Sequence, residues 1–185
     1  MISCRRAAWF AFAAWFALVH FCIGAFSTAA LSAETIDRVL AIVAGQLITL
    51  SDVTAARELG LDGAASQTRA ADPVRAVLNT LIDRELVLAE VERYAPSEPL
   101  PEAIDREAAR VRTRFASADA FAAALARAGL DERDLREILR QDLRIAAYLD
   151  QRFTAAETRR QTLVDDWLAG LRNRGEIVDL YLTRN

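Results

Sequence analysis

The segment from Asp72 to Tyr94 constrains the fold more than any other part of this chain. An acidic residue followed by Pro73 is typical of a helix start. Behind it, apolar residues recur at spacings of three and four and predict one buried helix face: Val74, Val77, Leu78, Leu81, Ile82 and Leu88. The helix ends near Tyr94 because three prolines follow it: Pro96, Pro99 and Pro101. The 185 residues include only seven glycines and four prolines, which excludes a turn-rich sandwich or barrel and favours a mostly helical chain.

Capping residues place further helices on both sides of this one. Ser51 and Asp52 predict the start of a short helix that ends near Gly60. One helix is predicted before Ser117 and another after it, and Ser117 caps the second of them. That second helix ends in a pair typical of a Schellman stop, Gly129 and Leu130. The residues expected on the inward faces of these two helices are Ile104, Ala108, Val111, Phe115, Phe121 and Leu125.

Asp131 predicts the start of another long helix. Its inward residues are expected to be Leu135, Ile138, Leu139, Ala146, Leu149 and Phe153. The four residues from Thr154 to Glu157 match a capping box, which predicts a last helix that ends at Gly175. This helix is expected to run through Leu163, Trp167 and Leu171, and Trp167 is expected to pack in the core.

Two apolar, partly β-branched segments predict strands far apart in the chain. Residues 38–43, a turn at 44–46 and residues 47–49 read as a hairpin, because Gly45 supplies the positive φ of a tight turn. Residues 177–182 alternate, with Val178, Leu180 and Leu182 on one side. An isolated strand would leave its backbone groups unpaired, so the first and last strands are expected to pair. The predicted fold class is mostly α with a small terminal β-sheet (α+β).

The first 33 residues have the layout of a secretory signal peptide. Arg5 and Arg6 precede an apolar run over residues 7–23 that only His20 interrupts, and small residues follow as far as Ala33. We expect cleavage before Glu34 and a periplasmic location for one domain over residues 34–185, of which 154–185 form a returning helix and strand. The alternative is an uncleaved inner-membrane anchor facing the periplasm, because residues 7–26 are long enough to span a bilayer. A membrane contact is expected only in that case.

Residues 34–185 contain no Cys, His, Lys or Met, and their 21 arginines against 26 acidic residues give a net charge of -5. With no basic excess, nucleic acid is not an expected partner. Without imidazole, thiol or amine, the Ser-His-Asp, Cys-His and Ser-Lys mechanisms are excluded. Zinc ligands and a P-loop are missing as well. We therefore expect no catalytic residue, metal or cofactor; paired carboxylates of a glycan-cleaving enzyme are the one remaining enzymatic option.

The order of these elements resembles the amino-terminal core of SurA-type periplasmic chaperones. Residues 39–53 read VLAIVAGQLITLSDV and are similar to the family's opening strand, turn and Ser-Asp-Val element. Residues 77–88 resemble its next helix, residues 135–153 the helix that closes the core, and residues 167–182 the returning helix and strand. The resemblance covers residues 34–153 and 160–182.

Two departures from the family pattern limit what the resemblance implies. Ala44 stands where the family usually has Asn, so the turn is expected to differ in type. Relatives carry a parvulin prolyl isomerase domain before the terminal helix, and the residues between Phe153 and Leu163 leave no room for one. The resemblance implies an ATP-independent chaperone core without isomerase activity, whose partners are unfolded polypeptides such as outer-membrane proteins. The alternative is a non-catalytic scaffold protein of the cell envelope.

Five aromatic residues are candidates for contacting such clients, because aromatic rings supply large contact area at low entropy cost. They are Tyr94, Phe115, Phe121, Tyr148 and Phe153. The alternative is that these rings belong to the core, since three of them share the inward faces of their helices. Two rows of arginines four residues apart are expected to form solvated helix faces: Arg106, Arg110 and Arg114, and Arg136, Arg140 and Arg144. No pattern specifies an oligomeric state.

Overall fold

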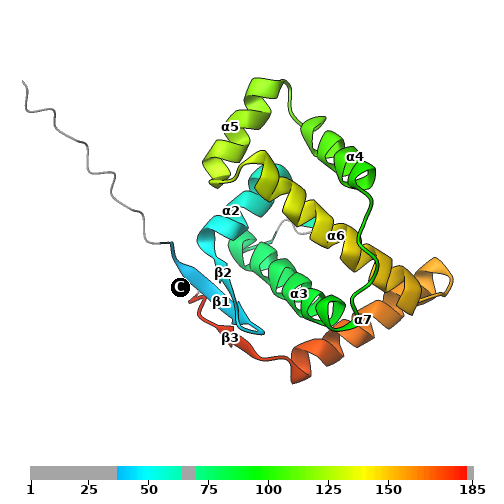
Figure 1. Ribbon diagram of the computed structural model, residues 1–185. Coiled ribbons are helices and arrows are strands. Elements are labelled where there is room, and N and C mark those ends of the chain that lie inside the picture. Colours follow the sequence, from blue (N-terminus) through cyan, green and yellow to red (C-terminus); the bar gives the residue numbers. More distant parts are fainter. Residues whose placement is uncertain (1–36, 64–69, 183–185) are drawn as a thin grey trace, which may run out of the picture. The chain divides into compact units, whose positions relative to one another are not determined.

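A β-hairpin leads directly into a helix at the start of the described chain (Figure 1). The computed structural model describes residues 37–63 and 70–182; the expected signal segment and its cleavage bond lie outside them. Strand β1 (Val39–Val43) pairs antiparallel with β2 (Gln46–Thr49), and α2 (Leu50–Leu59) follows without a loop. The cap of α2 is Thr49, whose N–H donates to the Asp52 carboxylate over 2.7 Å. The predicted start at Ser51 is therefore wrong, because the helix begins at Leu50.

The two residues of the hairpin turn both have left-handed backbone conformations. Ala44 has a φ of 49° and Gly45 a φ of 82°. Positive φ at both central positions is the signature of a type I′ turn, whose twist matches that of the paired strands. Asn and Gly adopt this conformation readily, whereas the Cβ of alanine makes it unfavourable. The expectation that Ala44 changes the turn type is therefore wrong, because both turn residues have the positive φ of an Asn-Gly turn.

Replacing Ala44 by Asn should therefore stabilise the protein by about 0.5–1 kcal/mol, because Asn tolerates the left-handed region that the turn requires. The gain is measured as a higher urea midpoint with an unchanged slope. Gly45→Ala is the matched control and should lower the midpoint, since it introduces the same strain at the neighbouring position. Equal midpoints for A44N and the wild type would contradict the turn geometry.

The sheet joins segments from opposite ends of the described chain. Its strand order is β2-β1-β3, and β3 (Ile177–Asp179) pairs antiparallel with β1, placing Ile42 beside Val178. The predicted pairing of the first and last strands is confirmed. The last strand is shorter than the predicted 177–182, although the Leu180 N–H still donates to the Leu40 carbonyl over 2.9 Å. Beyond it, the Tyr181 hydroxyl donates to the Asp72 carboxylate over 2.9 Å, which ties this end to a helix start.

Five helices follow α2 among the described residues: α3 (Pro73–Tyr94), α4 (Pro101–Arg112), α5 (Ala118–Ala128), α6 (Glu132–Arg152) and α7 (Glu157–Arg174). The predicted caps at Asp72, Ser117 and Asp131 are confirmed, and Gly129 has the left-handed conformation of a Schellman stop. The predicted capping box at Thr154 is wrong. Helix α7 has Ala156 as its N-cap, and alanine carries no side-chain oxygen that could cap a helix. The fold class is mostly α with a small antiparallel sheet, as predicted.

Two hydrophobic cores lie along α6. The first packs the sheet against α3, the second half of α6 and α7, and includes Leu40, Leu78 and Tyr148. The second packs the end of α2 against α4, α5 and the first half of α6, and includes Phe121 and Leu135. Two expectations for α6 are wrong: Ala146 is exposed, and Arg144 is buried with 6% of its surface exposed. Helix α6 contributes Leu139 to the second core and Tyr148 to the first, and Arg144 lies between these two residues along the helix.

Candidate functional site

A groove of about 540 Å³ lies between β2, α2, α3 and α6. The order of the elements along the chain explains where this groove lies. Helix α2 starts where β2 ends, so the strand and the small residues Ala55 and Ala56 form one continuous wall. The opposite wall is one face of α3, on which Leu81, Arg84, Glu85, Leu88 and Glu92 recur at helical spacing. Apolar side chains on both walls and on α6 include Leu47, Ile48, Leu61, Leu81, Leu88 and Ile138.

Strand β2 borders this groove with an unpaired edge. Within the described residues β2 is an edge strand, and it contributes Gln46, Leu47 and Ile48 to the lining. In a two-residue hairpin the pair beside the turn, here Val43 and Gln46, is hydrogen-bonded, and bonded and non-bonded pairs then alternate. Leu47 faces Ile42 in the next pair, so its backbone N–H and C=O point outward. The groove thus offers apolar side chains beside main-chain hydrogen-bonding groups.

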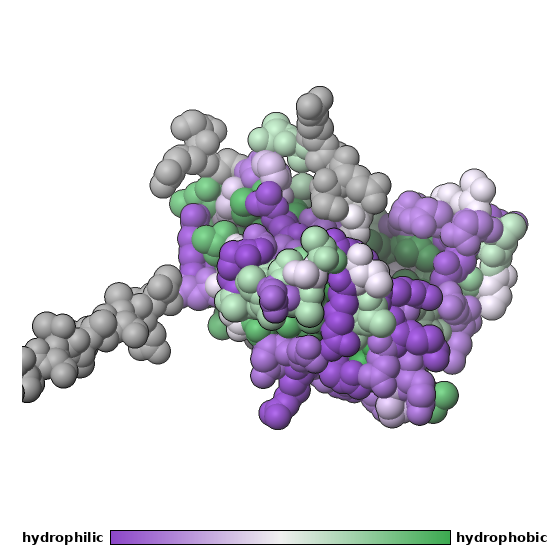
Figure 2. All heavy atoms as spheres, turned by 90° about the horizontal axis from the view of Figure 1, so that it is seen from above, coloured by the Kyte–Doolittle hydropathy of each residue, from purple (hydrophilic) through white to green (hydrophobic). Residues whose placement is uncertain are grey.

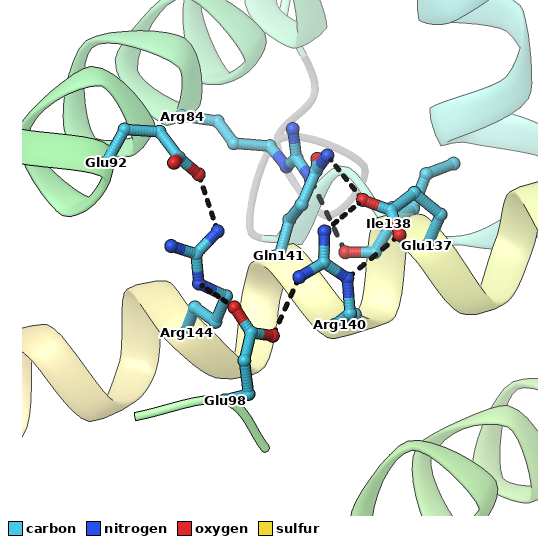
Figure 3. A network of polar contacts seen from close by, with 8 residues as sticks. All are labelled: Arg84, Glu92, Glu98, Glu137, Ile138, Arg140, Gln141 and Arg144. Carbon is cyan, nitrogen blue, oxygen red and sulfur yellow. Dashed lines mark hydrogen bonds and ion pairs between the residues drawn. The ribbon is translucent and has the colours of Figure 1, made fainter. Parts of the chain in front are cut away.

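Arg84 is one of the polar residues of the groove, and it joins α3 to α6 (Figure 3). Its Nε donates to Asp142 over 2.9 Å, and its Nη2 donates to the Gln141 side chain over 2.9 Å. Its Nη1 donates to Glu85 over 2.8 Å. Charge-assisted bonds of this kind are stronger than neutral ones, and the side chain is only 20% exposed. Arg84 therefore fixes the separation of the two helices beneath the groove.

A second set of arginines extends this contact along α6, beside the groove (Figure 3). Arg144 pairs with Glu92 of α3 over 2.5 Å and with Glu98, in the segment between α3 and α4, over 3.3 Å. Arg140 donates to Glu98 and to Glu137, and its hydrogen bonds to Glu137 hold the pKa of the Glu137 carboxyl below its usual range. The prediction of a solvated face is wrong for Arg144, because two carboxylates from other segments converge on it.

Three of the five predicted aromatic candidates meet in one cluster with Trp167. The ring centroids of Tyr94 and Tyr148 are 5.6 Å apart, those of Tyr148 and Trp167 6.0 Å, and those of Phe153 and Trp167 5.5 Å. Tyr148 is buried, which raises the pKa of its hydroxyl, while Tyr94 is 60% exposed. Arg152 donates to the Tyr148 hydroxyl over 3.2 Å and lies over the rings of this cluster.

The other two candidates, Phe115 and Phe121, form a separate pair 5.5 Å apart in the second core. Phe121 is buried there and Phe115 is half-buried. The described lining of the groove contains none of the five aromatic candidates. Sequence reasoning missed the groove residues because it assigned Leu81 and Leu88 to the core. A signal was present in α3, where Arg84 and Glu85 interrupt the apolar face between those two leucines.

Within residues 37–63 and 70–182, His, Cys, Asp and Glu form no group of three or more that could hold a metal ion. No helix in this part combines the length and the apolar character needed to cross a bilayer. Seen from above, hydrophilic residues cover most of the described face, and hydrophobic ones show between them and in a recess (Figure 2).

No family model matches the chain, and no curated protein matches it significantly. The groove and its chemistry are therefore the basis on which a function can be argued.

Proposed function

We propose that this protein is an ATP-independent chaperone-like module that holds unfolded, apolar polypeptides such as outer-membrane proteins in the groove. The observation that carries the proposal is the apolar groove beside the edge strand β2. An unfolded chain exposes both apolar side chains and unpaired backbone groups. Leu47 offers backbone groups to such a chain, while Leu81, Leu88 and Ile138 offer apolar surface.

The energetics of this groove favour reversible holding over permanent binding. Burying roughly 400 Å² of apolar surface gives on the order of 10 kcal/mol. Association costs roughly 4–15 kcal/mol in lost translational and rotational freedom, and ordering a flexible client adds to this cost. The two terms nearly cancel, so a client binds weakly and leaves without nucleotide hydrolysis. The proposal thus requires no catalytic residue, metal or cofactor.

The proposal includes a location and a family relationship. The signal-like residues 1–33 support export to the periplasm. The similarity of residues 39–53 and 77–88 to SurA-type chaperones supports a chaperone core that lacks the isomerase domain. The aromatic cluster of Tyr94, Tyr148 and Phe153 lies apart from the groove residues, and in this proposal only the exposed Tyr94 remains a candidate for client contact.

Filling the groove should abolish holding. Ala89 is half-buried on the α3 wall, and Ala89→Trp places a large ring in the space that a client segment would occupy. The full chain, expressed with its N-terminal segment and purified, is mixed at several-fold excess with a urea-unfolded porin, and aggregation is followed by light scattering after dilution. The wild type should suppress most of the scattering, whereas A89W should suppress little.

Ala123→Trp is the matched control, because Ala123 is exposed on α5 and is not among the groove residues. It should suppress aggregation as the wild type does, and circular dichroism checks that both variants are folded. A wild type that leaves the scattering unchanged would reject the chaperone function and favour the scaffold alternative. Equal suppression by A89W and A123W would place client binding somewhere other than the groove.

A further inference from the structure

The charged side chains in the groove are mostly carboxylates. Its described lining includes Asp52, Glu85, Glu92 and Asp142 but only one cation, Arg84. Arg84 is shared between Glu85 and Asp142, and Glu92 is paired with Arg144 from beside the groove. Among the described residues, Asp52 accepts hydrogen bonds from the Thr49 N–H and hydroxyl and pairs with no arginine. Even with Arg144 included, the carboxylates outnumber the guanidinium groups by four to two.

The guanidinium of Arg84 has little capacity left for a ligand. Its Nε and Nη1 donate to Asp142 and Glu85, and its Nη2 donates both to the Gln141 side chain and to the Ile138 carbonyl. These bonds use four of the five guanidinium N–H groups, so an acidic ligand could gain at most one bond without displacing another. A cationic ligand can approach carboxylate oxygens directly, because carboxylates accept several hydrogen bonds each. The side chains of Asp142 and Glu92 are 39% and 61% exposed, which leaves them accessible.

We infer that the groove selects extended segments in which apolar side chains are flanked by Lys or Arg, over equally apolar segments flanked by Asp or Glu. This inference rests on the proposed function, since it names the kind of polypeptide that the groove holds. The apolar walls supply affinity, and the carboxylates discriminate between clients by electrostatic complementarity. The preference should weaken with salt, because exposed charges are screened over about 3 Å at 1 M ionic strength.

Two fluorescein-labelled peptides test the inference. Both contain the same central run of Leu, Val and Ser, and one carries two Lys at each end where the other carries two Glu. Fluorescence anisotropy with the full chain at low salt should give a dissociation constant about tenfold lower for the Lys peptide. In roughly 1 M salt the two constants should agree within about twofold, because screening removes the electrostatic contribution.

A pair of double variants separates the groove from the overall negative charge of the protein. Glu85→Gln with Asp142→Asn removes two groove charges and keeps oxygen acceptors for Arg84. Glu102→Gln with Asp119→Asn removes two charges from the first turns of α4 and α5, which do not contribute to the groove. The groove variant should retain about a threefold preference or less, while the distant variant should keep the preference of the wild type.

The outcomes distinguish this inference from the function on which it rests. Equal binding of both peptides by the wild type, or equal loss of preference in the two double variants, would overturn the charge selection and leave the chaperone function standing. If neither peptide binds at any salt concentration while the protein is folded, the groove does not hold polypeptides and both proposals are wrong.

Discussion

Replacing Leu78 by Ala should lower the free energy of unfolding by about 3–4 kcal/mol. The Leu78 side chain lies on α3 in the first core and has 0% of its surface exposed. Its truncation loses the transfer free energy of the removed carbons and leaves a cavity between the sheet and α3 that the surrounding helices cannot fill. Because natural domains are stable by only about 5–15 kcal/mol, this loss is a large fraction of the total.

Urea unfolding followed by circular dichroism measures this effect, with the slope of the transition as a check that the two-state treatment holds. Leu163→Ala is the matched control: Leu163 lies on α7 and is 39% exposed, so the same truncation should cost less than about 1 kcal/mol. Losses of similar size in the two variants would show that α3 does not pack on the sheet as described.

Replacing Gly175 by Ala should destabilise the protein by about 2–3 kcal/mol through steric overlap. A Cβ at this position would lie 2.6 Å from Cδ2 of Leu86 and 2.8 Å from the backbone oxygen of Leu171. The φ of Gly175 is −75°, which alanine adopts without strain, so the cost comes from the neighbours alone. Leu86 is buried in the first core and has little freedom to move, and the Leu171 carbonyl accepts the N–H of Gly175.

Gly170→Ala should have the opposite effect, because Gly170 lies inside α7, whereas Gly175 is its C-cap. Its Cβ would meet only the end of the Arg174 side chain, at 3.2 Å, and this flexible side chain can move aside. Alanine is favoured over glycine in a helix interior by up to about 1 kcal/mol, so this variant should be more stable than the wild type. Both differences are read from urea midpoints, and a change of the same sign in the two variants would contradict the contacts around Gly175.

Local sequence signals predicted most of the fold because they act within one turn of the chain. Asp72, Ser117 and Asp131 each cap the helix that follows, and each bond spans three residues or fewer. A wrong prediction arises where the local pattern of a residue resembles a helix start but the residue lies in a segment connecting two helices. Thr154 matches a capping box, yet the chain from Phe153 to Ala156 connects α6 to α7, and the Phe153 ring contacts Trp167. The helix starts at Glu157, and Ala156 is its N-cap.

The groove could not be predicted because it depends on contacts between distant segments. Spacing along α6 indicates an exposed Arg144, but Glu92 and Glu98 approach it only once α3 and the following segment are in place. Likewise Leu81 and Leu88 fit an apolar helix face, and only the position of β2 and α2 leaves them half-buried beside a space. Periodicity identifies which residues avoid water but not which of them remain available to a ligand.

Because β1 pairs with β3, the sheet can be completed only late in the synthesis of the chain. The hairpin leaves the ribosome early, whereas Ile177, the partner of Val43, follows only after all the described helices. Until then the second edge of β1 is open, and open strand edges recruit strands from other chains. A nascent or prematurely terminated chain would therefore carry an aggregation-prone edge that the finished protein covers with its own β3.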